Sequence, residues 1–80
     1  MISLIDLPYL IELVARDIKN LSTTIANEST SDELRNDCGE LLMVATRTAG
    51  NLQNQYTSEW NNGGNFPSYN ELIVDIEQRI

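Results

Sequence analysis

Eighty residues are enough for one domain with a single small core. The only cysteine, Cys38, rules out an intrachain disulfide, and without histidine the chain lacks the ligands of a structural zinc site. Twelve acidic residues against five basic ones give a net charge of −7. This charge disfavours direct binding to nucleic acid or to an anionic membrane, because both offer phosphates that lysine and arginine neutralise. It favours a protein partner with a basic surface, although acidity also serves solubility alone.

The first five residues are apolar apart from Ser3 but have no basic flank, and the charged residues Asp6 and Glu12 follow them. They match neither a signal peptide nor a membrane span. Cys38 lies at an apolar helix position, which is typical of a small buried side chain in a reducing compartment. We therefore expect a cytoplasmic protein.

A first helix is predicted over residues 7–26. Asp6 is a suitable N-cap, Pro8 is tolerated in the first turn, and Glu12 and Arg16 are spaced as a helical ion pair. Apolar residues recur at steps of three and four through this segment: Leu7, Ile11, Val14, Ile18, Leu21 and Ile25.

A second, central helix is predicted over residues 31–60. Thr30 and Glu33 have the spacing of a capping box at its start. Gly50 could interrupt it, but we expect one continuous helix. Its apolar stripe is the longest in the chain: Leu34, Cys38, Leu41, Ala45, Ala49, Leu52 and Tyr56.

A third helix is predicted over residues 68–80, after an Asn-Gly linker and Pro67. Ser68 and Glu71 form a second capping box, and an apolar stripe follows in Tyr69, Ile73, Ile76 and Ile80. No pattern typical of a β-hairpin is present. The sequence predicts an all-α fold: residues 1–80 form a single antiparallel three-helix domain with a long central helix, completed by dimerisation.

The sequence offers no catalytic machinery. Histidine, the commonest general base, is absent, and no glycine-rich phosphate loop precedes a lysine. We therefore predict no enzyme activity, no catalytic residue, no cofactor and no metal site.

One acidic cluster supports an alternative. Glu33, Asp37 and Glu40 fall at i, i+4 and i+7 of the central helix. This cluster resembles the acidic helix pairs of MazG-type nucleotide pyrophosphatases, and the resemblance implies Mg²⁺-dependent nucleotide hydrolysis. Such enzymes carry acidic motifs on two facing helices, whereas a solvated first turn favourable to the helix dipole also explains these residues.

A non-enzymatic interaction module is the function we predict. Four of the five aromatic residues bracket the Asn-Gly linker, and clustered tryptophan and tyrosine are frequent interface anchors, although they could equally pack the linker onto the third helix. Size and acidity are compatible with small inhibitor or immunity proteins, including those of phages, which occupy a basic target surface. The predicted partner-binding residues are Glu33, Asp37, Glu40, Tyr56, Trp60 and Phe66.

A homodimer is the second expected association. The three stripes supply more apolar surface than a monomer of this length can cover, and the disulfides or structural metal that usually stabilise small domains are not expected here. We expect a symmetric dimer packed along the central helix. A purely structural, self-assembling subunit is therefore another alternative. The predicted interface residues are Gly39, Leu42, Met43, Thr46 and Gly50.

Overall fold

The computed structural model describes residues 6–61 and 66–80. They form three helices, α1 (Leu7–Ala26), α2 (Asp32–Asn61) and α3 (Tyr69–Arg79), and this part of the chain contains no strand. The predicted all-α class is confirmed, and each helix bound lies within one residue of its predicted position. The apolar first five residues and the Gly63-Gly64 pair lie outside the described residues.

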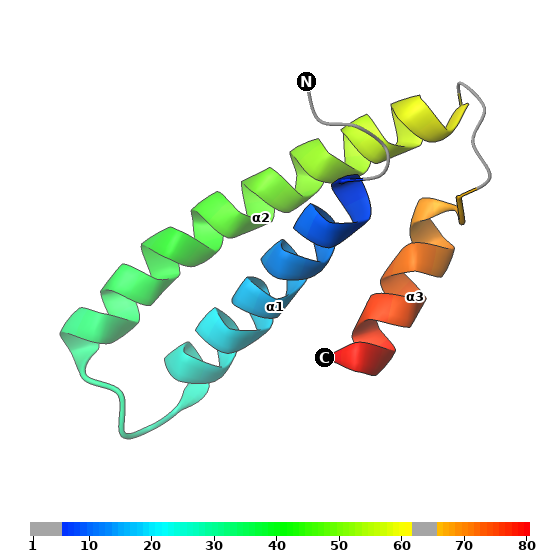
Figure 1. Cartoon of the computed structure of the whole chain (residues 1–80). Helices are drawn as coiled ribbons and strands as arrows, with labels where there is room; N and C mark the ends of the chain where they lie inside the picture. The colour runs from blue at the N-terminus through cyan, green and yellow to red at the C-terminus, as the bar shows by residue number, and fades with distance from the viewer. Residues whose placement is uncertain (1–5, 62–65) are drawn as a thin grey trace.

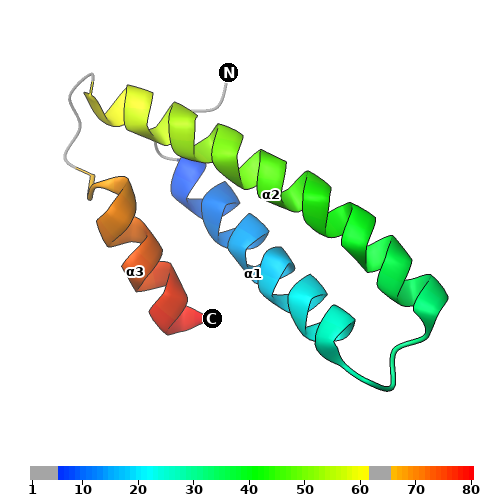
Figure 2. The ribbon, with the colours of Figure 1, turned by 180° about the vertical axis from the view of Figure 1, so that it is seen from behind.

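The helices form an elongated molecule of 47 × 25 × 15 Å. The α1 and α2 helices lie side by side along most of their length, with the start of α1 against the end of α2 (Figures 1 and 2). The short α3 lies at that same end, beside the start of α1 (Figure 1). Among the described residues, no third helix lies against the opposite end of the α1–α2 pair, next to the connection between these helices (Figure 1).

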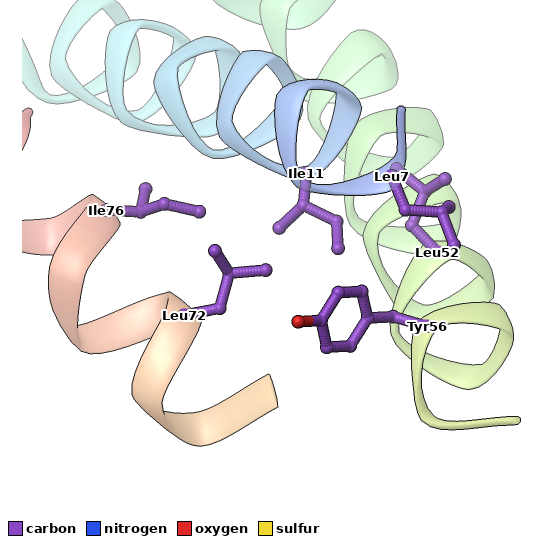
Figure 3. Packing of buried hydrophobic residues seen from close by; sticks show 6 residues of the cluster. All are labelled: Leu7, Ile11, Leu52, Tyr56, Leu72 and Ile76. Atoms are coloured by element: carbon purple, nitrogen blue, oxygen red, sulfur yellow. The ribbon is translucent and has the colours of Figure 1, made fainter. Parts of the chain in front are cut away.

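The main core lies where all three helices meet. Six buried apolar side chains point toward one another there (Figure 3), and each helix supplies two of them: Leu7, Ile11, Leu52, Tyr56, Leu72 and Ile76. Away from this cluster, α2 buries only Cys38 and Ala45, at positions that face α1. The expected burial of Cys38 as a small apolar side chain is thus observed.

Two members of the predicted α2 stripe are not core residues. Leu34 and Leu41 are 48% and 56% exposed. Because each residue turns the helix by about 100°, Leu41 lies about 60° around α2 from the buried Cys38. Leu34 lies about 40° from Cys38 on the same edge of the stripe. α1 alone leaves this edge exposed, and α3 packs at the other end of α2, against Leu52 and Tyr56.

The start of α2 is capped by Ser31, not by Thr30 as predicted. Ser31 Oγ accepts the amide of Leu34 at 3.2 Å, whereas Thr30 Oγ1 donates to the carbonyl of Thr24 at 2.7 Å. The Thr30 hydroxyl therefore binds a carbonyl in the last turn of α1, which also accepts the backbone amide of Asn27 at 3.3 Å. The predicted capping box is displaced by one residue, and position N3 is then Leu34, which cannot bond back.

The two other caps differ from each other. Ser68 Oγ accepts the Glu71 amide at 3.3 Å, as predicted for the start of α3. The Asp6 side chain makes no capping bond to α1, contrary to prediction, because Asp6 itself has helical backbone angles. Its carbonyl accepts the Leu10 amide instead.

Candidate protein interaction surface

Most basic side chains of this protein are engaged within the molecule. Glu12 on α1 binds two of them: Arg16 Nη2 at 3.4 Å, as the spacing predicted, and Arg79 Nε of α3 at 2.8 Å. The hydrogen bond from Arg79 is the main reason why the pKa of Glu12 is lowered, with smaller contributions from the charges of both arginines. This carboxylate therefore joins α1 to α3 and is in contact with two cations.

Two further basic groups bind near helix ends. Lys19 donates to the carbonyl of Ile80. Arg35 donates to the carbonyls of Ile25 and Asn27, both at 3.1 Å, and pairs with Asp32 at 3.1 Å. Arg47 is the one basic side chain with no such contact in the part of the chain that the structure describes.

The acidic side chains have the opposite distribution. Apart from Glu12, Asp32 and Asp6, nine carboxylates within residues 6–61 and 66–80 have no basic partner, and all of these except Glu59 are exposed. They are Asp17, Glu28, Glu33, Asp37, Glu40, Glu59, Glu71, Asp75 and Glu77. The net negative charge is therefore presented at the surface, where it can act on a partner.

One side of α2 combines these carboxylates with exposed apolar groups. Leu34, Leu41 and Val44 are 48%, 56% and 54% exposed. At about 100° per residue, they share a sector of about 120° with the three predicted acidic residues. We call this surface the acidic flank; it consists of Glu33, Leu34, Asp37, Glu40, Leu41 and Val44. Sequence reasoning missed its apolar half, because Leu34 and Leu41 fit the core stripe equally well.

The other side of α2 carries a shallow groove. Its volume is about 490 Å³. Four of the five predicted dimer residues line it, Gly39, Leu42, Met43 and Thr46, together with Arg47, the basic residue without a contact in the described part of the chain. No acidic residue is among them. Gly50, the fifth predicted residue, is exposed but does not line the groove. We call this surface the Met43 groove.

The aromatic cluster serves mainly to hold α3 and its preceding turn. Tyr56 is completely buried, and its hydroxyl donates to the Pro67 carbonyl. Its ring packs edge-on against Tyr69, with 6.3 Å between centroids. Burial, and to a lesser extent the charge of Glu71, raise the pKa of Tyr56. Tyr56 is thus inaccessible to a partner in this fold, contrary to its predicted role, because packing of α3 encloses it.

The two other predicted aromatic anchors remain partly accessible. Trp60 is 39% exposed, and its Nε1 donates to the carbonyl of Phe66 at 2.8 Å. Phe66 is half-buried against the core cluster. Both lie at the α3 end of the molecule, away from the acidic flank near the start of α2. The structure does not bring the predicted partner residues into one surface.

The described residues include no group of three or more cysteine, aspartate or glutamate side chains close enough to hold a metal ion. None of their helices is long and apolar enough to cross a membrane. No family model, curated protein or solved structure matches this chain.

Proposed function

We propose that this chain is a non-enzymatic binding module whose acidic flank occupies a basic surface of another protein. The distribution of charge carries the proposal. Four of the five basic side chains are engaged inside the molecule, whereas nine carboxylates within residues 6–61 and 66–80 have no basic partner and eight of these are exposed. A surface arranged in this way attracts cations over several ångströms and repels other acidic molecules.

Charge alone gives orientation and speed of association rather than strong binding. The exposed Leu34, Leu41 and Val44 supply what charge lacks, because removing apolar area from water contributes about 25 cal/mol per Å². Specific interfaces combine an apolar centre with a polar rim. The acidic flank has this composition, and we propose a partner surface that is apolar in its middle and bordered by lysine or arginine.

This mode of binding suits a small inhibitor or immunity-type protein, such as those of phages, which acts by covering a target rather than by chemistry. That part of the proposal rests on size, acidity and surface character alone. It includes a cytoplasmic location, for which a single cysteine in a buried position argues.

A second candidate function is that of a structural subunit whose partner is a further copy of itself. The Met43 groove supports it, because Met43 is 68% exposed there without a covering element. In this version the antiparallel three-helix arrangement is completed by dimerisation, and the acidic surface only keeps the assembly soluble.

The decisive experiment compares two charge-reversed variants in capture from cell extract, with the bound proteins identified by mass spectrometry. The first carries Glu33→Lys and Asp37→Lys on the acidic flank. The control carries Glu71→Lys and Asp75→Lys on α3, which change the net charge equally at another exposed place.

We expect a basic protein that the wild type and the control retain and that the acidic-flank variant loses. Its retention should fall as salt is added, since screening weakens exposed charge interactions. Equal losses in both variants would show that only net charge matters. If the wild type retains no basic protein, the proposal is wrong.

A further inference from the structure

We propose that two copies of this chain associate through the Met43 groove, with the two α2 helices antiparallel and Arg47 of each copy paired with Glu40 of the other. This inference rests on the second candidate function and deepens it. It uses one residue at the edge of the acidic flank, Glu40, and its readout is self-association, which is distinct from capture of a basic protein. It also names an ionic contact that neither the sequence pattern nor the isolated chain displays.

The shape of the groove is complementary to itself. Met43 projects from α2 with 68% of its surface exposed, and Leu42 beside it is half-buried. One turn earlier, a Cβ atom placed on Gly39 would meet no other atom within 4 Å, so open space lies next to the projecting side chain. In a two-fold dimer the same patch meets itself: the Met43 side chains of the two copies meet at the axis, and the space beside Gly39 of each copy receives Arg47 of the other.

The charges of the groove fit the same arrangement. Arg47 lies four residues after Met43, and Glu40 lies three residues before it. When two antiparallel helices cross at Met43, position 47 of one lies opposite positions 39 and 40 of the other. Two-fold symmetry then forms the Arg47–Glu40 pair twice. Flanking charges of this kind set orientation and partner choice in paired helices.

Apart from Glu40 at its edge, the acidic flank does not suit a second copy. Pairing it with itself brings the Glu33 and Asp37 carboxylates of both copies together, and like charges in contact oppose association. The Met43 groove has no acidic lining residue and contains Arg47, the only basic group of the described residues that is still available. Among the exposed apolar surfaces of α2, the groove is therefore the one that fits another copy of an acidic chain.

The chain has surface available for one interface of ordinary size. It exposes 5617 Å², more than the roughly 4,850 Å² of a compact folded monomer of 9.0 kDa, because its shape is elongated at 47 × 25 × 15 Å. A standard interface buries roughly 800 Å² on each partner.

The test is a charge exchange read by analytical ultracentrifugation across a dilution series. The variants are Arg47→Glu, Glu40→Arg and the double variant that carries both. Each single variant replaces two attractive contacts with two repulsive ones, and we expect its dissociation constant to rise about tenfold. The double variant restores both contacts with reversed polarity and should associate as the wild type does. Glu28→Arg, an exposed change outside the groove, is the control and should have no effect beyond its general charge.

Three results would overturn the proposal. One is a wild-type chain that stays monomeric up to millimolar concentration. Another is a dimer whose dissociation constant is the same in both single variants as in the wild type. The third is a double variant that remains as weak as the singles, since that would show a simple dependence on surface charge. Circular dichroism of each variant verifies that the helices are intact, as expected for exposed positions.

Discussion

Replacing Tyr56 with phenylalanine removes one hydroxyl group from a completely buried side chain at the junction of the three helices. The ring remains in place, so the contacts with Tyr69 and the core are retained. What disappears is the hydrogen bond to the Pro67 carbonyl, which holds the turn before α3 against α2.

The expected loss of stability follows from the environment of that bond. A typical intramolecular hydrogen bond contributes about 1 kcal/mol net, and Pro67 is only half-buried, so water can reach its carbonyl in the variant. About 1 kcal/mol shifts the melting temperature of a domain of this size by roughly 4–8 °C. Tyr9→Phe, the same chemical change at a side chain that is 67% exposed, is the matched control.

Thermal unfolding followed by circular dichroism measures this shift, and the single tryptophan gives a second probe. Trp60 donates to Phe66 in the same turn, so its fluorescence reports the docking of α3. If Tyr56→Phe melts within a degree of the wild type, or Tyr9→Phe falls as far, the structural role assigned to this hydroxyl is wrong.

We also expect Tyr56 to make the stability of the fold depend on pH in the alkaline range. Because burial raises its pKa, Tyr56 loses its proton in the unfolded chain at a lower pH than in the folded one. The contribution of Tyr56 to the free energy of unfolding is therefore fully present below the pKa of the unfolded chain, near 10, and is lost as pH rises through the pKa of the folded chain. Tyr69 has a pKa raised by burial as well, so Tyr56→Phe should reduce the alkaline loss without abolishing it.

The remaining predictions concern the other contacts that place the helices. Glu12→Gln should lower the stability at neutral pH and make the stability fall less steeply in acid. The pKa of Glu12 is lowered in the folded chain, so the stability that this carboxylate contributes is lost as pH falls through the folded pKa. Urea titrations from neutral to acidic pH, with Arg79→Gln for comparison, test this. Ile76→Ala should cost about 2–5 kcal/mol at a completely buried site, whereas Val74→Ala, at 52% exposure, should cost less than about 0.5 kcal/mol by the same urea unfolding. Ser31→Ala should cost about 1 kcal/mol through loss of the α2 cap, and an unchanged midpoint would contradict the assignment of that cap.

The sequence determined the local structure of this protein. The spacing of apolar residues follows the 3.6-residue turn of a helix, and the breaks between stripes coincide with polar or glycine-rich segments, so three helices could be placed closely. The Ser68 cap was predictable for the same reason, since it depends on residues only three positions apart. Residue spacing could not decide whether Thr30 or Ser31 caps α2, because the Thr24 carbonyl of the preceding helix binds the Thr30 hydroxyl.

Tertiary structure alone decided which members of each stripe are covered. Leu34 and Leu52 are equivalent in the sequence pattern, yet one is 48% exposed and the other 7%, because α3 and the start of α1 reach only the far end of α2. The two surfaces proposed for binding have the same origin. Arg35 and Arg79 bind groups that are distant in the chain, so Arg47 is left as the available cation. These pairings depend on how the helices pack, which no residue spacing specifies.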